Sequence, residues 1–141
     1  MLIMTFNLRF QNDFDGDNGW EARKEFVVDL IQRYRPTVLG TQEGTIGQLE
    51  YLRKYLTGYD LYAPQRYWDK DCHYCSLLFR TGELRPVDGG EFWLSETPER
   101  HRSLGWDSAF PRMMSYGFFE HGAEGKLFCA ATCSDVTTKS R

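Results

Sequence analysis

Two oxygen-bearing side chains near the start of the chain follow short apolar runs and are suited to holding a divalent cation. Asn7 ends the run at residues 2–8, and Glu43 follows a second run at residues 37–41. Mg²⁺ prefers such oxygen donors and keeps several waters beside them. If the runs are parallel neighbours in a sheet, both side chains lie at the edge where α/β sheets bind ligands. The pattern predicts a Mg²⁺ site, which Mn²⁺ could also occupy. Alternatively, Glu43 is a solvated carboxylate at a helix N-terminus, and Asn7 is a turn-forming residue at the end of a strand.

The four cysteines suggest a second kind of site. Cys72-His-Tyr-Cys75 has the spacing of a zinc site, and Cys129 with Cys133 could complete a set of four ligands. Strand alternation instead places Cys75 and Leu77 on one face as ordinary core residues. We expect core cysteines. Four cysteines without a recognisable signal segment predict reduced thiols in a cytoplasmic protein.

Two other motifs lack the features that their chemistry needs. The segment at residues 13–19 is rich in Asp and Asn, but Asn18 stands where a calcium-binding EF-hand needs Gly, and Lys24 stands where it needs Glu. We expect this segment to be a loop at the rim of a cleft. None of the three histidines has a Ser or Cys partner in a recognisable catalytic motif, which argues against nucleophilic catalysis.

The first half of the chain predicts two helices. The first begins at an Asn18–Glu21 capping box and ends before Pro36, and the second begins at a Thr45–Gln48 capping box. The first helix is expected to bury one face, formed by Phe26, Val27, Leu30, Ile31 and Tyr34.

The second half predicts strands separated by Gly- and Pro-containing turns. These strands are expected at residues 59–63, 73–80, 84–94, 113–120 and 126–132.

The composition of the chain limits the classes of function that it can have. The chain has 141 residues, 41% of them hydrophobic and 26% charged, which is typical of one globular domain. Its formal charge of −3 argues against binding nucleic acid by bulk electrostatics, leaves nucleic acid open as a partner, and weakly favours a small phosphoester. No apolar run approaches the roughly 18 residues of a membrane span.

Motifs along nearly the whole chain resemble those of the endonuclease/exonuclease/phosphatase superfamily, and they occur in the same order. They are Thr5-Phe-Asn-Leu-Arg9, Trp20-Glu-Ala-Arg23, Gly40-Thr-Gln-Glu43, Phe92-Trp-Leu-Ser-Glu-Thr-Pro98, Gly105-Trp-Asp107 and Pro111-Arg-Met-Met-Ser-Tyr116.

This resemblance implies an α/β fold, part of a four-layer α/β/β/α sandwich, and Mg²⁺-dependent hydrolysis of phosphoesters. It implies that Glu43 is a metal ligand and that Asn7 helps to hold metal, phosphate or water. Tyr74 and Arg112 fall in segments that line the family's cleft.

The sequence departs from the family pattern in two ways. Ala131 and Cys133 stand where the family has Asn and His, and the G-D-x-N and S-D-H motifs, which supply a catalytic Asp and His, do not occur. We therefore expect residues 1–141 to form a single incomplete domain, truncated after roughly the first half and inactive or weakly active. An exposed apolar sheet face would favour self-association. The alternatives are a non-catalytic remnant and a small sheet-rich interaction module.

Overall fold

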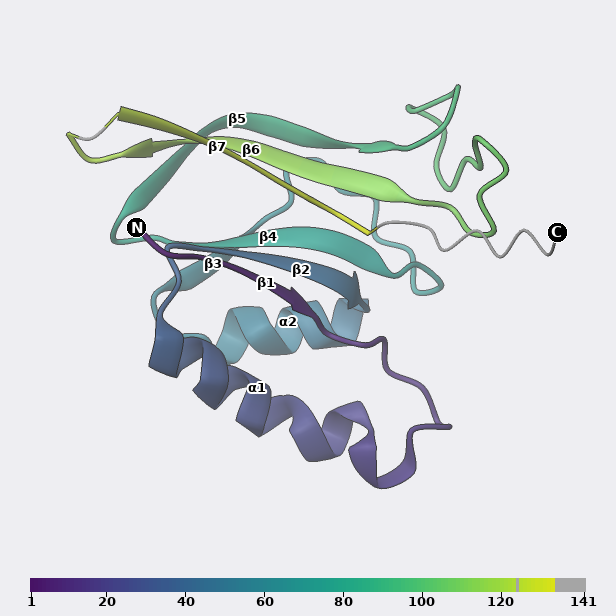
Figure 1. Ribbon diagram of the computed structural model, residues 1–141, viewed down its shortest axis with the longest axis horizontal. Coiled ribbons are helices and arrows are strands. Elements are labelled where there is room, and N and C mark those ends of the chain that lie inside the picture. Colours follow the sequence, from purple (N-terminus) through teal and green to yellow (C-terminus); the bar gives the residue numbers. More distant parts are fainter. Residues whose placement is uncertain (124, 134–141) are drawn as a thin grey trace, which may run out of the picture.

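The computed structural model describes residues 1–123 and 125–133, in which two sheets lie face to face and two helices cover the outer side of the first sheet (Figure 1). In chain order the elements are β1 (Ile3–Asn7), the short 3-10 helix η1 (Gly16–Asn18), α1 (Trp20–Tyr34), β2 (Val38–Gly44), α2 (Ile46–Tyr55), β3 (Tyr59–Tyr62), β4 (Tyr74–Arg80), β5 (Leu84–Trp93), β6 (Met113–His121) and β7 (Gly125–Thr132).

The first sheet has the strand order β1-β2-β4-β3. β1 and β2 are parallel, as expected for strands joined through a helix, and Asn7 lies opposite Gln42. β4 runs antiparallel to both β2 and β3. The carboxyl ends of β1 and β2 therefore meet at one edge of the sheet, as predicted from the sequence.

The predicted capping box at the start of α1 does not form. Asn18 belongs to η1, so the helix begins after Gly19, which makes no side-chain cap hydrogen bond. The carbonyl of Asn18 instead accepts a hydrogen bond from Arg23 Nε at 2.6 Å. The short helix thus takes the residue that would otherwise cap α1.

The buried face of α1 is narrower than predicted. Val27 and Ile31 are buried together with Trp20, whereas Phe26 and Tyr34 are exposed. Trp20 meets Tyr51 of α2 edge to face, with ring centroids 5.8 Å apart. Because α1 packs against α2 as well as the sheet, the stripe that faces inward shifts away from Phe26 and Tyr34.

The second sheet, with the order β5-β6-β7, packs against the first and covers its inner face. The apolar face expected to be exposed is therefore buried, because the chain supplies its own second sheet. What stays exposed is the outer face of that second sheet, where four rings contact one another. This outer aromatic face consists of Phe92, Tyr116, Phe118 and Phe128.

A buried ion pair joins the two sheets. Arg66, from the loop before β4, pairs with Glu91 of β5, and its Nε lies 2.9 Å from Glu91 Oε2. The same guanidinium donates to Ser76 Oγ and to the carbonyl of Cys75, both on β4, at 2.8 and 3.0 Å. Ser115 of β6 donates to Glu91 Oε1 at 2.8 Å. One side chain thus links the facing sheets.

The described residues include no helix that is both long and apolar enough to cross a membrane. All four cysteines are free thiols, and three of them are buried.

Candidate functional site

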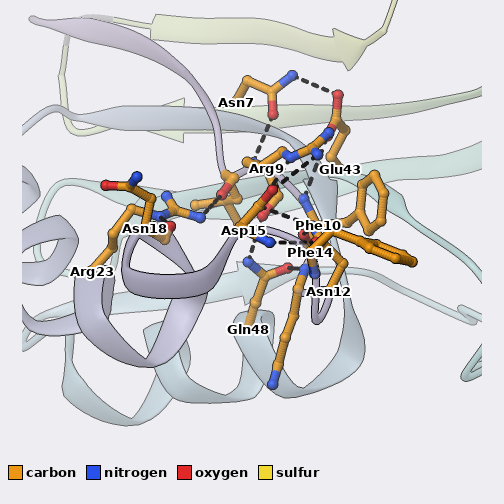
Figure 2. A network of polar contacts seen from close by, with 12 residues as sticks. Asn7, Arg9, Phe10, Asn12, Phe14, Asp15, Asn18, Arg23, Glu43 and Gln48 are labelled. Carbon is orange, nitrogen blue, oxygen red and sulfur yellow. Dashed lines mark hydrogen bonds and ion pairs between the residues drawn. The ribbon is translucent and has the colours of Figure 1, made fainter.

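Asn7 and Glu43 meet at the edge of the first sheet (Figure 2). Asn7 Nδ2 donates to Glu43 Oε1 at 2.9 Å, and Asn7 Oδ1 accepts from the backbone N–H of Arg9 at 2.8 Å. The second carboxylate oxygen, Glu43 Oε2, accepts from the N–H of Phe10 at 3.4 Å. A carboxylate offers about four lone-pair positions. Both oxygens of Glu43 therefore keep capacity for a cation.

The backbone of Glu43 adopts an unusual conformation. Its φ is 59°, in the left-handed region that residues other than Gly rarely occupy. The register between β2 and β4 shifts between Thr41 and Gly44, so this segment is a β-bulge. Bulges redirect side chains at the ends of strands. The apolar run at residues 37–41 predicts a strand that ends at Thr41, but the bulge extends β2 to Gly44.

The loop that follows β1 is held by its own polar side chains (Figure 2). Arg9 donates two hydrogen bonds of 3.1 Å to Asp15, and Asn12 Nδ2 donates a third at 2.8 Å. The bonds from Arg9, followed by that from Asn12, lower the pKa of Asp15. The Asp15 carboxylate therefore orders the loop beside Glu43.

Gln48 ties this loop to α2. The predicted capping box forms, with the N–H of Thr45 donating to Gln48 Oε1 at 3.0 Å. The other side of the same amide, Gln48 Nε2, donates to the carbonyl of Arg9 at 2.9 Å, and the side chain is fully buried. The sequence predicted the cap but carries no signal for the contact with the loop.

A cavity of about 420 Å³ opens beside Glu43, and Arg112 also lines it. Phe10 and His73 contribute a stacked pair with ring centroids 4.2 Å apart. Burial lowers the pKa of His73, although the nearby Glu43 acts in the opposite direction. Cys133 completes this part of the wall, and Arg112 Nη1 lies 3.8 Å from its sulfur. The cavity thus combines a carboxylate, a guanidinium and aromatic surface.

Tyr74 lies elsewhere. It is absent from the wall of that cavity and lines a smaller one of about 150 Å³. Its hydroxyl accepts from the N–H of Asp69 at 2.6 Å and donates to the carbonyl of Tyr67 at 3.0 Å. Burial raises the pKa of Tyr74 to about 12. The structure therefore brings Asn7 against Glu43 and places Glu43 and Arg112 in the wall of one cavity, whereas Tyr74 lines the other.

A further polar group, formed by Asp69, Cys72 and His101, was not foreseen from the sequence. These residues lie on two loops and bring a carboxylate, a thiol and an imidazole together. The histidine comes 29 residues after the cysteine, a separation with no recognisable motif. Within the described residues, the four cysteines do not assemble into a ligand group.

Comparison with solved structures gives clear relatives. The chain is similar to a mannosyl-6-phosphatase from Bacteroides thetaiotaomicron, with 30% identity, a TM-score of 0.87, and coverage of 99% of this chain and 54% of that one. It is similar to an endonuclease/exonuclease/phosphatase from Bacteroides vulgatus, with 29% identity, a TM-score of 0.86, and coverage of 93% and 51%. The human nocturnin catalytic domain shares the fold at 19% identity, with a TM-score of 0.70 and coverage of 97% and 50%.

The chain spans about half the length of these solved structures. No family model matches the sequence, and no curated protein matches it.

Proposed function

Because this chain belongs by fold to the endonuclease/exonuclease/phosphatase superfamily, we propose that its site serves the metal-dependent hydrolysis of a small phosphoester. The observation that carries the proposal is the contact between Asn7 and Glu43, 2.9 Å apart at the edge of the sheet. Glu43 and Arg112 face one cavity there, which gives a cation and a phosphate adjacent places.

Glu43 is the residue proposed to hold the metal. Its carboxylate is a hard oxygen donor with spare lone pairs, which suits Mg²⁺, with Mn²⁺ as a substitute. Asn7 directs its Nδ2 to Glu43 while its own oxygen is engaged by the N–H of Arg9. We propose that Asn7 first positions Glu43, and that it reaches metal, phosphate or water directly when the Arg9 contact opens.

Arg112 is proposed to bind the phosphate. A guanidinium carries a permanent charge and donors that match phosphate oxygens. A bound divalent metal would polarise the phosphoryl oxygen and offset the negative charge that develops on it. The similarity to a mannosyl-6-phosphatase supports a small phosphoester as the substrate, and the net charge of −3 does not favour a long nucleic acid.

We propose that residues 1–141 correspond to about half of the family's domain. Neither G-D-x-N nor S-D-H occurs among them, and Ala131 and Cys133 replace two polar family residues. Each general acid or base typically contributes about 10²–10⁴-fold to the rate. A polypeptide of these residues alone should bind metal yet hydrolyse phosphoesters near the background rate. A non-catalytic role would give the same binding.

The test measures the binding of Mn²⁺ to the 141-residue chain by isothermal titration calorimetry. We expect Glu43→Gln to weaken binding at least tenfold, because it removes the charged donor. Glu50→Gln is the matched control, since Glu50 is an exposed carboxylate on α2. Equal affinity in the wild type and Glu43→Gln would overturn the metal assignment.

Hydrolysis of p-nitrophenyl phosphate with Mg²⁺ or Mn²⁺ tests the second part. We expect rates close to background for the 141-residue chain. Robust turnover that Glu43→Gln abolishes would show that these residues already contain a complete active site.

A further inference from the structure

The unforeseen polar group lies in the wall between the two cavities. Asp69 and Cys72 belong to the loop between β3 and β4, and His101 belongs to the loop between β5 and β6. His101 Nε2 lies 2.9 Å from Asp69 Oδ2, and Cys72 Sγ lies 3.7 Å from that oxygen and 3.9 Å from that nitrogen. Cys72 lines the larger cavity and His101 lines the smaller one.

These three distances, 2.9, 3.7 and 3.9 Å, lie on either side of the separations expected around a tetrahedral metal centre. Three donors around zinc, at bond lengths of about 2.0–2.3 Å, lie roughly 3.3–3.6 Å apart. The triangle formed by Asp69 Oδ2, Cys72 Sγ and His101 Nε2 has a circumradius of about 2.1 Å. A metal slightly above its plane would reach all three atoms with ordinary zinc bond lengths and keep a fourth position open.

The Asp69 carboxylate is held in the orientation that such a site needs. Its other oxygen, Oδ1, accepts from the N–H of Asp71 at 2.9 Å, which leaves Oδ2 toward the thiol and the imidazole. The N–H of Asp69 is itself fixed by the hydroxyl of Tyr74. Contacts of this kind orient metal ligands and strengthen binding.

The imidazole is also held in place. The His101 ring lies edge to face with Tyr67, at 4.8 Å between centroids, and with Trp93, at 5.3 Å and an interplanar angle of 88°. Its side chain is 34% exposed, so an ion can reach it from solvent. Two aromatic rings thus limit the freedom of the only ligand that comes from the second loop.

These three residues do not form the catalytic triad of a cysteine protease. Asp69 and Cys72 both approach the same nitrogen of His101, whereas a triad needs the carboxylate and the thiol on different ring nitrogens.

Arg102 is the neighbouring charge that a cation must displace. Its Nη1 lies 3.6 Å from Asp69 Oδ2, but its side chain is 43% exposed and can turn into solvent. This ion pair is a surface interaction, and such pairs contribute little to stability. Its loss is small beside the coordination bonds gained.

We propose that Asp69, Cys72 and His101 form a binding site for a soft divalent transition metal, with zinc as the ion that best fits the donor set. Glu43 is not a member of this ligand group, although Glu43 and Cys72 line the same cavity, and the group differs from a four-cysteine set. Binding converts the Cys72 thiol to a thiolate and releases that proton to solvent, and the His101 ring would bind through Nε2 with its own proton held on Nδ1.

The test uses Co²⁺ as a spectroscopic probe for zinc in the full 141-residue chain. We expect one equivalent of Co²⁺ to produce a near-ultraviolet sulfur-to-cobalt charge-transfer band, and one equivalent of Zn²⁺ to abolish it. Cys72→Ser should remove the band, and His101→Asn should weaken binding at least tenfold. Cys129→Ser, which removes another buried thiol, is the matched control and should retain it.

Glu43→Gln separates this site from the proposed phosphoester site, because the cobalt band should persist in that variant while Mn²⁺ binding is lost. Proton release, measured by titration in two buffers of different ionisation enthalpy, should accompany zinc binding to the wild type and be smaller for Cys72→Ser. Absence of the band, or an unchanged band in Cys72→Ser, would overturn the proposal. Circular dichroism spectra that match the wild type would show that the variants are folded.

Discussion

Replacing Arg66 with Met should destabilise the protein more than any replacement of an exposed arginine. The Arg66 side chain is 1% exposed and that of Glu91 is 11% exposed. Removing the guanidinium leaves the Glu91 carboxylate buried, with the hydroxyl of Ser115 as its remaining partner in the cluster described above. Breaking a buried ion pair from one side costs about 3–5 kcal/mol.

The matched control is Arg53→Met. Arg53 pairs with Asp60 at 2.9 Å, but the two side chains are 62% and 42% exposed. Exposed pairs contribute about 0–1 kcal/mol. For a chain of this length, the difference between the two variants corresponds to a shift in melting temperature of roughly 10 °C.

Urea unfolding followed by tryptophan fluorescence measures both variants, with circular dichroism as a second probe. The double replacement Arg66→Met with Glu91→Leu should recover part of the loss, because an apolar pair no longer leaves a charge without its partner. If Arg66→Met lost no more stability than Arg53→Met, the ion pair would not be what aligns the two sheets.

Three further predictions concern one or two side chains each. Burial raises the pKa of Tyr59, so its contribution to stability is complete below pH 10 and is lost as the pH rises above it. Tyr59→Phe should lose about 1 kcal/mol of stability near neutrality, because the hydrogen bond to Pro36 is removed. In urea unfolding at alkaline pH, the stability of this variant should fall less steeply with pH than that of the wild type. Gln48→Ala should cost about 1–2 kcal/mol and weaken Mn²⁺ binding, measured by titration, because both the cap and the loop contact are lost. The double replacement Phe118→Ser with Phe128→Ser should reduce self-association, measured by sedimentation velocity. If the double variant and the wild type associated equally, the outer aromatic face would not be responsible.

The sequence was informative about the positions and directions of the strands. The two apolar runs joined by a helix fixed the parallel arrangement of β1 and β2, and this placed Asn7 beside Glu43. In the second half, the alternation of apolar and polar residues predicted the ends of β4 to β7 to within one or two residues.

It was uninformative wherever segments that are distant in the sequence meet. Arg66 lies in a segment without periodicity, and its partner Glu91 is 25 residues away. His101 reaches Asp69 across 32 residues for the same reason. The bulge that turns Glu43 is set by pairing with β4, so no pattern within β2 reveals it.

Gln48 makes two separate contacts, and this affects how the sequence can change in evolution. Its amide closes the first turn of α2 with one end and holds the carbonyl of Arg9 with the other. A substitution at this position is therefore felt by the helix and by the loop beside Glu43 at once. Among descendants of this sequence, residues 45 and 48 should change together or not at all, because the Thr45 hydroxyl accepts a hydrogen bond from the N–H of Gln48. Residue 9 can vary more freely, because Gln48 holds only its backbone carbonyl. The start of α2 should therefore change as slowly as the site itself.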